Sequence, residues 1–67
     1  MEIVKPTQQG VTVRLTVEEL VAVNNALNEA CSEIEDWEFS TRMGCELADA
    51  QALLAQVSNA IDAASAS

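Results

Sequence analysis

The clearest hydrophobic pattern lies between residues 17 and 35, where apolar residues recur at the three- and four-residue spacing of one helical face. These residues are Val17, Leu20, Leu27, Cys31 and Ile34. Directly before them, Thr16-Val17-Glu18-Glu19 has the sequence of a capping box. In such a box the Thr16 hydroxyl accepts a hydrogen bond from the Glu19 amide, and the Glu19 carboxylate accepts one from the Thr16 amide. The pattern therefore predicts an amphipathic helix over about residues 17–35.

Two shorter patterns before this helix are typical of β-strands. Ile3 and Val4 are β-branched, and residues 11–15 alternate between apolar and polar side chains. The segment from Pro6 to Gly10 between them has the composition of a turn. We therefore expect a β-hairpin with strands at about residues 2–5 and 11–15. Because an isolated hairpin is only marginally stable in water, we expect it to lie against the helices.

A second helix is predicted over about residues 46–63. Its apolar stripe consists of Leu47, Ala50, Leu54, Val57 and Ile61. We expect the two helices to be roughly antiparallel and to share one core with the hairpin. The residues expected to be buried in that core are Leu20, Leu27, Ile34, Leu54, Val57 and Ile61.

Residues 37–43, between the two helices, also alternate in polarity, with Trp37, Phe39, Thr41 and Met43 on one side. Two interpretations fit this alternation: a third strand added to the hairpin, or an extended connection whose aromatic residues close one end of the core. Both predict an extended segment or short strand over residues 37–43, ended by Gly44. The chain is thus expected to be a single small α+β domain over residues 1–67, with a frayed tail at residues 64–67.

The formal net charge of −8 results from eleven acidic residues against Lys5, Arg14 and Arg42. Three scattered cations do not form a basic patch, so the composition argues against binding to nucleic acid or to an anionic membrane surface. It favours a basic or neutral protein partner.

An acidic run at the end of the first predicted helix is the candidate interaction patch. It consists of Glu33, Glu35, Asp36, Trp37 and Glu38. Acids at the carboxyl end of a helix oppose its dipole, so this run breaks a local rule. Within the patch, Trp37 would be the apolar anchor for a partner.

Cys31 and Cys45 are too few for the disulfide framework of a small secreted protein, which favours a reducing compartment. An acid at Glu2 and a proline at Pro6, with no apolar run between them, give no reason to expect a signal peptide. No stretch approaches the roughly 18 apolar residues of a transmembrane helix. We therefore expect a cytoplasmic protein of bacterial type.

Familiar catalytic and metal-binding patterns are missing from the sequence. It has no histidine, the commonest general base and metal ligand. Two cysteines do not supply the four ligands of a structural zinc site, and the acidic run lacks the Asp-x-Asp-x-Asp-Gly pattern of a calcium loop. Gly10 and Gly44 stand alone, so no phosphate-binding loop is present. We expect neither an enzyme nor a bound metal or cofactor.

The segments Asn24–Cys31 and Phe39–Gly44 resemble stretches of small acidic bacterial proteins, a resemblance that brings no activity with it. It implies that four residues form one polar cluster: Asn24, Asn28, Glu29 and Arg42. Asn24 lies within the apolar stripe, so its amide needs a hydrogen-bonding partner, and we expect it to tie a nearby loop or strand to the helix. A ligand role for Asn24 is the alternative. Arg42 is expected to pair with Glu29 or Asn28 and so to fix the extended segment.

Two functions from different classes fit these observations. The first is a non-catalytic interaction module that docks on, or inhibits, a basic or neutral protein, as toxin-neutralising immunity proteins do. The second is a self-associating structural or accessory subunit, a homodimer without a separate ligand. The small core favours it, and so does an uncharged face of the second helix formed by Ala48, Ala52 and Ala55.

Overall fold

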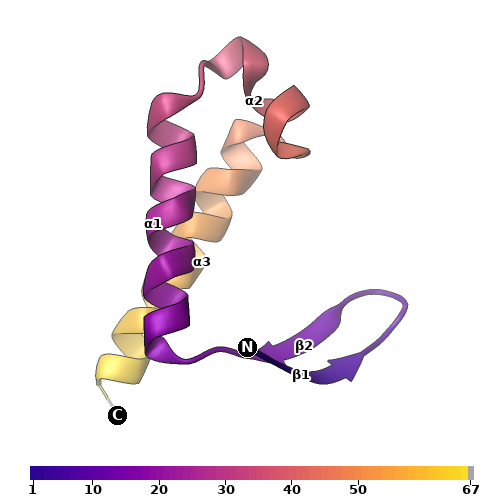
Figure 1. Ribbon diagram of the computed structural model, residues 1–67, viewed down its shortest axis with the longest axis vertical. Coiled ribbons are helices and arrows are strands. Elements are labelled where there is room, and N and C mark those ends of the chain that lie inside the picture. The colour runs from indigo at the N-terminus through magenta and orange to yellow at the C-terminus, as the bar shows by residue number, and fades with distance from the viewer. Residues whose placement is uncertain (67) are drawn as a thin grey trace.

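The computed structural model describes residues 1–66 and contains an N-terminal antiparallel β-hairpin followed by three helices (Figure 1). The strands are β1 (Glu2–Pro6) and β2 (Val11–Arg14), and the helices are α1 (Val17–Glu33), α2 (Asp36–Met43) and α3 (Leu47–Ser65). This architecture confirms the α+β class, the hairpin and the two long helices. α3 includes residues 64 and 65 of the expected frayed tail, whose last residue, Ser67, lies outside the described residues. Within residues 1–66, no helix is both long and apolar enough to cross a membrane.

α1 begins with the capping box that the sequence predicts. The Glu19 amide donates to Thr16 Oγ1 over 3.1 Å, and the Thr16 amide donates to Glu19 Oε1 over 2.9 Å. Glu18 and Glu19 also place negative charge at the positive end of the helix dipole. At its other end α1 stops at Glu33, because Ile34 takes an extended conformation with a ψ of 130°.

Residues 36–43 form α2, so the expected extended segment or short strand over residues 37–43 is wrong. Asp36 and Glu38 lie in the first turn of this new helix, where acids stabilise the helix dipole instead of opposing it. Arg42 lies in the last turn, at the end that favours a cation. Gly44 ends α2 in the left-handed conformation with a φ of 77°, and its amide donates to the Ser40 carbonyl over 2.9 Å.

α1 and α3 run antiparallel and pack against each other, as expected (Figure 1). The six stripe residues expected to be buried are only half-buried: Leu20, Leu27, Ile34, Leu54, Val57 and Ile61. Within residues 1–66 only Phe39 of α2 and Ala50 of α3 are fully buried, with exposed fractions of 0% and 1%. Two helices that touch along one line cover each other's apolar stripes incompletely, and α2 packs only on α3.

The hairpin does not pack on the helices, contrary to the expectation of one shared core. Every residue of β1 and β2 is exposed, and the strands project sideways from the foot of the helix pair (Figure 1). Thr7 closes the hairpin loop: its amide donates to the Gly10 carbonyl over 2.7 Å, and its hydroxyl oxygen accepts from the Gly10 amide over 3.1 Å. The molecule is consequently flat and open, with extents of 38 × 30 × 15 Å.

Replacing Phe39 by alanine should destabilise the protein far more than replacing Trp37 by alanine. Both residues belong to α2, but Phe39 is completely buried whereas Trp37 is 80% exposed. Truncation of a buried phenylalanine typically costs about 3–5 kcal/mol of unfolding free energy. Urea unfolding followed by circular dichroism would measure both variants. Equal unfolding midpoints for Phe39→Ala and Trp37→Ala would contradict the central place of Phe39 in the core.

Candidate functional site

One face of the hairpin is entirely apolar. In the antiparallel register Ile3 lies opposite Val13, and Pro6 lies opposite Val11. Directly opposed residues share a face of a sheet, and so do residues two positions apart on one strand, such as Val11 and Val13. Ile3, Pro6, Val11 and Val13 therefore lie together, and we call them the apolar sheet face. An irregularity between residues 3 and 5 of β1 absorbs one extra residue, Val4, and preserves this alternation.

The opposite face of the hairpin is polar. It carries the opposed pairs Glu2/Arg14 and Lys5/Thr12. The guanidinium Nη1 of Arg14 donates to Glu2 Oε1 over 2.8 Å. Both side chains are largely exposed, so this ion pair contributes only about 0–1 kcal/mol. The hairpin thus has the two-sided pattern of a sheet that is covered on one face.

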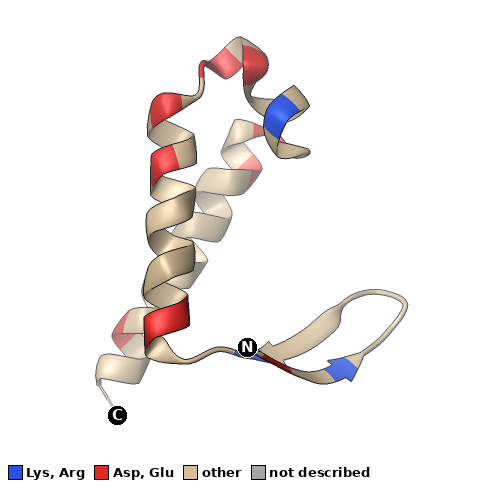
Figure 2. Ribbon diagram, in the orientation of Figure 1, with Lys and Arg blue, Asp and Glu red and all other residues tan. Residues whose placement is uncertain are grey.

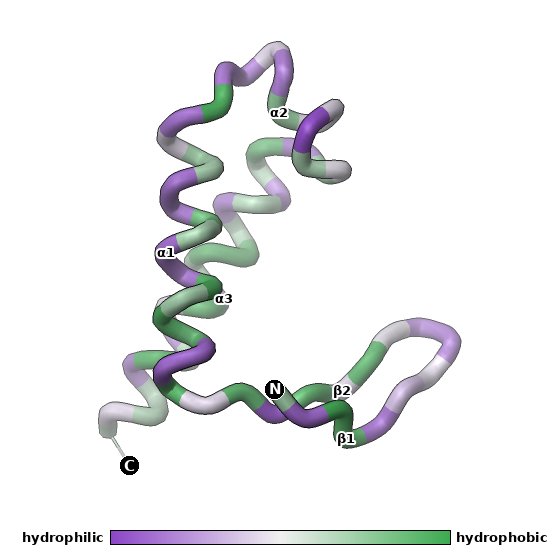
Figure 3. Tube along the Cα trace, viewed as in Figure 1, coloured by the Kyte–Doolittle hydropathy of each residue, from purple (hydrophilic) through white to green (hydrophobic). Residues whose placement is uncertain are grey.

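The apolar sheet face nevertheless lies open to solvent. Ile3 is 64% exposed, Val11 55% and Val13 39%. Figure 3 shows hydrophobic segments in both strands, well away from the helices. The alternation in β2 is as the sequence predicts, but the expected burial of its apolar side against the helices is wrong. An apolar sheet face normally lies against a second layer of structure, and the described chain supplies none here.

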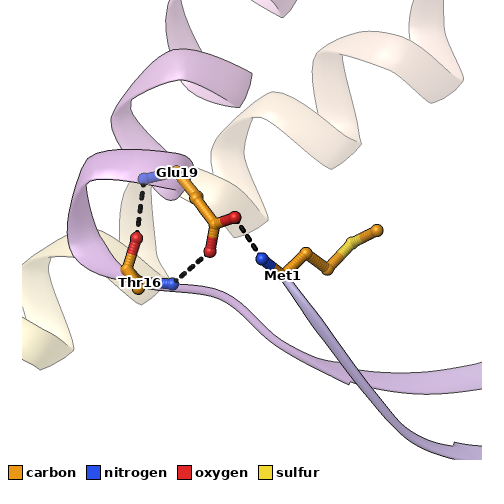
Figure 4. Close-up of polar contacts among 3 residues, drawn as sticks. All are labelled: Met1, Thr16 and Glu19. Atoms are coloured by element: carbon orange, nitrogen blue, oxygen red, sulfur yellow. Dashed lines mark hydrogen bonds and ion pairs between the residues drawn. The ribbon is translucent and has the colours of Figure 1, made fainter.

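A short junction sets the direction in which the hairpin points. Only Leu15 and Thr16 separate β2 from α1, and Thr16 is held by the capping box. The terminal ammonium group of Met1 donates to Glu19 Oε2, while Glu19 Oε1 accepts from the Thr16 amide (Figure 4). Glu19 therefore ties both ends of the hairpin to the first turn of α1.

The same contacts change the acidity of Glu19. Its hydrogen bond to the Met1 ammonium group is the main cause, and the hydrogen bond from the Thr16 amide adds to it. Together they hold the pKa of Glu19 below the ordinary glutamate value of 4.5.

The predicted acidic patch lies at the opposite end of the molecule, around the connection between α1 and α2 (Figure 2). We call it the acidic bend: Glu33, Glu35, Asp36, Trp37 and Glu38. Trp37 is 80% exposed, the largest exposed fraction among the large apolar residues of the described chain. The three acids nearest to the bend itself, Glu33, Glu35 and Asp36, are also exposed. An exposed indole therefore lies next to exposed carboxylates in the chain.

No hydrogen bond or ion pair within residues 1–66 joins the members of the expected polar cluster, Asn24, Asn28, Glu29 and Arg42. Ser58 Oγ of α3 donates to Asn24 Oδ1 over 2.7 Å, so Asn24 connects the two long helices and not a loop or strand. The guanidinium group of Arg42 lies 4.0 Å from a carboxylate oxygen of Glu38 in its own helix. The expected pairing of Arg42 with Glu29 or Asn28 is therefore wrong, and both of those residues are exposed.

The alanine face proposed for self-association is present on α3. Ala48, Ala52 and Ala55 are all exposed, on the side away from the stripe that packs on α1. This face is flat and uncharged but carries no larger apolar side chain. It offers less apolar surface than the apolar sheet face.

The described residues offer little for small-molecule or metal chemistry. No pocket is found on the surface of residues 1–66, and no three acidic or cysteine side chains among them are grouped as metal ligands. Cys31 and Cys45 are free thiols, the first half-buried and the second exposed.

Comparison with known proteins gives no further assignment: no family model, no curated protein and no solved structure matches the chain.

The Glu19 contacts predict a specific acid sensitivity. A carboxylate whose pKa is lower in the folded state contributes stability above its unfolded pKa, and that contribution is lost as the pH falls through the folded value. The difference in melting temperature between the wild type and Glu19→Gln should therefore be largest at neutral pH and shrink below about pH 4.5. Thermal melts followed by circular dichroism at a series of pH values would measure it. Glu18→Gln, in the same turn but outside the capping box, is the control. A wild type and a Glu19→Gln variant with parallel pH profiles would contradict the prediction.

Proposed function

We propose that the protein is a non-catalytic protein-interaction module that buries its apolar sheet face against another polypeptide. The exposure of Ile3, Val11 and Val13 on one side of a projecting hairpin carries this proposal. Large apolar patches left open on a small protein commonly mark interaction sites.

The apolar sheet face is best suited to a protein partner. Ten of the eleven acids lie outside the hairpin, so an anionic membrane surface would repel the body of the molecule. The two strands pair only with each other, so each also presents an open edge of backbone amides and carbonyls. A polypeptide can cover the apolar face and satisfy such an edge at the same time, as strand-adding partners do.

The stability of the hairpin supports the same proposal. A two-stranded hairpin without a covering layer is marginally stable in water. Here it is held by the Thr7 loop contacts, one exposed ion pair and the ties at its root. Burial of the apolar sheet face would contribute roughly 25 cal/mol for each Å² removed from water, which is how such hairpins are normally stabilised.

Site-specific photocrosslinking would test this function in the cells that make the protein. A photoreactive amino acid at Val13 should give a covalent adduct with another polypeptide, because this position lies on the apolar sheet face. The same group at Thr12, on the polar face of the same strand, is the matched control and should give much less adduct. Equal yields at the two positions, or none at either, would refute burial of the apolar sheet face.

The acidic bend is a second candidate docking surface, favoured by the 80% exposure of Trp37. An exposed tryptophan that is flanked in the chain by acids suits a basic or neutral protein, with the indole as anchor and the acids steering the approach. This surface lies at the far end of the molecule from the hairpin, so both surfaces could be occupied together (Figure 2).

A photoreactive phenylalanine in place of Trp37 should therefore crosslink to a partner, and the yield of adduct should fall when the irradiation is carried out at high salt. Ser40, which is exposed on the same helix but outside the acidic bend, is the control position. A yield of adduct at position 37 that is unchanged by high salt during irradiation would rule out the electrostatic part of this candidate, because exposed charge pairs are screened.

A further inference from the structure

The surface area of the chain indicates how much of it is left to be covered. A compact monomer of 7.2 kDa exposes about 4,100 Å². This chain exposes 5139 Å². The excess of roughly 1,000 Å² is close to the area of about 800 Å² that each partner buries in an interface of standard size. The radius of gyration, 13.3 Å, likewise exceeds the roughly 11 Å expected for a compact chain of this length.

The hairpin is not covered by the helices of its own chain in this arrangement. The junction of two residues between β2 and α1 sets its direction, and neither strand packs on a helix. Thr16 is fixed by the capping box, and the start of β1 is fixed by the contact of Met1 with Glu19. The covering layer must therefore come from another chain.

The hairpin and the helices differ in charge. Within residues 1–15, Lys5 and Arg14 outnumber Glu2, so the hairpin has an excess of positive charge. The remaining residues hold the other ten acids against Arg42 alone. Figure 2 shows this division between the hairpin and the helices. Lys5 and Arg14 lie on the polar face of the hairpin, opposite the apolar sheet face, so they stay at the surface when the apolar sheet face is covered.

The helices present a surface of the required kind. Both long helices have stripes that are only half-buried, and each leaves larger apolar side chains exposed. On α1 these are Val17, Val21 and Val23, and on α3 it is Leu53, which is 48% exposed. The helical half thus has apolar groups without a full covering layer, as the hairpin has.

We infer that two copies of this chain form a homodimer by exchanging hairpins, the apolar sheet face of each copy packing on the α1–α3 pair of the other. This inference rests on the proposed function and names the polypeptide that covers the hairpin. The contact occurs twice, related by a two-fold axis, which is the usual symmetry of a homodimer and the usual form of a swapped element. Each hairpin thereby gains the covering layer that the helices of its own chain do not supply.

Sedimentation equilibrium of the purified full chain and of matched variants tests the exchange. Val13→Asp places a charge in the apolar sheet face, and Thr12→Asp adds the same charge to the polar face of the same strand. Leu53→Asp alters the exposed apolar surface of α3, and Gln51→Asp is its control at another exposed position of that helix. Circular dichroism establishes that each variant keeps its helices.

The wild type should be a dimer. Val13→Asp and Leu53→Asp should each raise the dimer dissociation constant about 100-fold or more, because each lost apolar contact occurs twice. The two control variants should change it less than about tenfold. A mixture of Val13→Asp and Leu53→Asp should recover dimer that neither forms alone. In the mixed dimer the normal hairpin of one chain meets the normal helices of the other, so one contact of the two is intact.

Three results would overturn the exchange. If the wild type stays monomeric at millimolar concentration, the partner of the hairpin is not a second copy of this chain. The proposed function then still stands if Val13 crosslinks to a different protein in cells, and falls if it gives no adduct. A dimer weakened by Val13→Asp but not by Leu53→Asp means that the hairpins meet each other. Equal effects of Val13→Asp and Thr12→Asp mean that the dimer uses another face.

Discussion

The two-residue junction between β2 and α1 is the constraint on which the rest of the molecule depends. Thr16 belongs both to this junction and to the capping box, so the turn that ends the hairpin also starts the helix. Glu19 strengthens the arrangement by binding the Thr16 amide and the Met1 ammonium group at once. The direction of the hairpin is thereby coupled to the axis of α1. A hairpin held in this way projects outward, and its apolar face points at solvent.

Because the hairpin projects away from the helices, the core consists of helical residues alone. Phe39 is the only large side chain within residues 1–66 that is completely buried, and it comes from the shortest helix. α2 exists because acids at its start, Arg42 near its end and Gly44 after it all favour a helix at that place. The long helices contribute stripes that remain half-buried. The chain consequently has the composition of a folded domain but too few internal contacts to hide its apolar groups.

Much of this fold is predictable from the sequence, because it is local. The capping box at Thr16, the stripes of both long helices and the alternation in β2 each depend on residues close together in the chain. α2 was missed because Trp37, Phe39, Thr41 and Met43 alternate like a strand. The helical signals are also present: Phe39 and Met43 are four residues apart, and Gly44 comes two residues after Arg42. Of the acids around the bend, Glu33 ends α1, whereas Asp36 and Glu38 lie in the first turn of α2.

The candidate site was less predictable, because it depends on where elements lie in space. The acidic bend is contiguous in the chain, so its residues could be grouped from the sequence and do lie together. The polar cluster required α2 to approach α1 in one particular way. Arg42 instead finds a partner one helical turn away at Glu38, and Asn24 finds one on α3. The periodicity of the sequence indicates which side of the hairpin is apolar, but it does not indicate what covers that side. Whether a face packs on its own chain depends on residues far away in the sequence.

The distribution of charge along the chain affects both the hairpin and the acidic bend. A chain with a net charge of −8 would ordinarily resist self-association through mutual repulsion. That repulsion is not uniform here, because the hairpin carries two of the three cations and the helices carry nearly all the acids. A contact between the hairpin of one copy and the helices of another therefore meets less repulsion than a contact between two helical halves. The acidic bend, at the far end from the hairpin, keeps its charge and its exposed Trp37. In the proposed dimer the burial of apolar surface is therefore concentrated at the hairpins, and the two acidic bends remain apart and free to meet a basic protein.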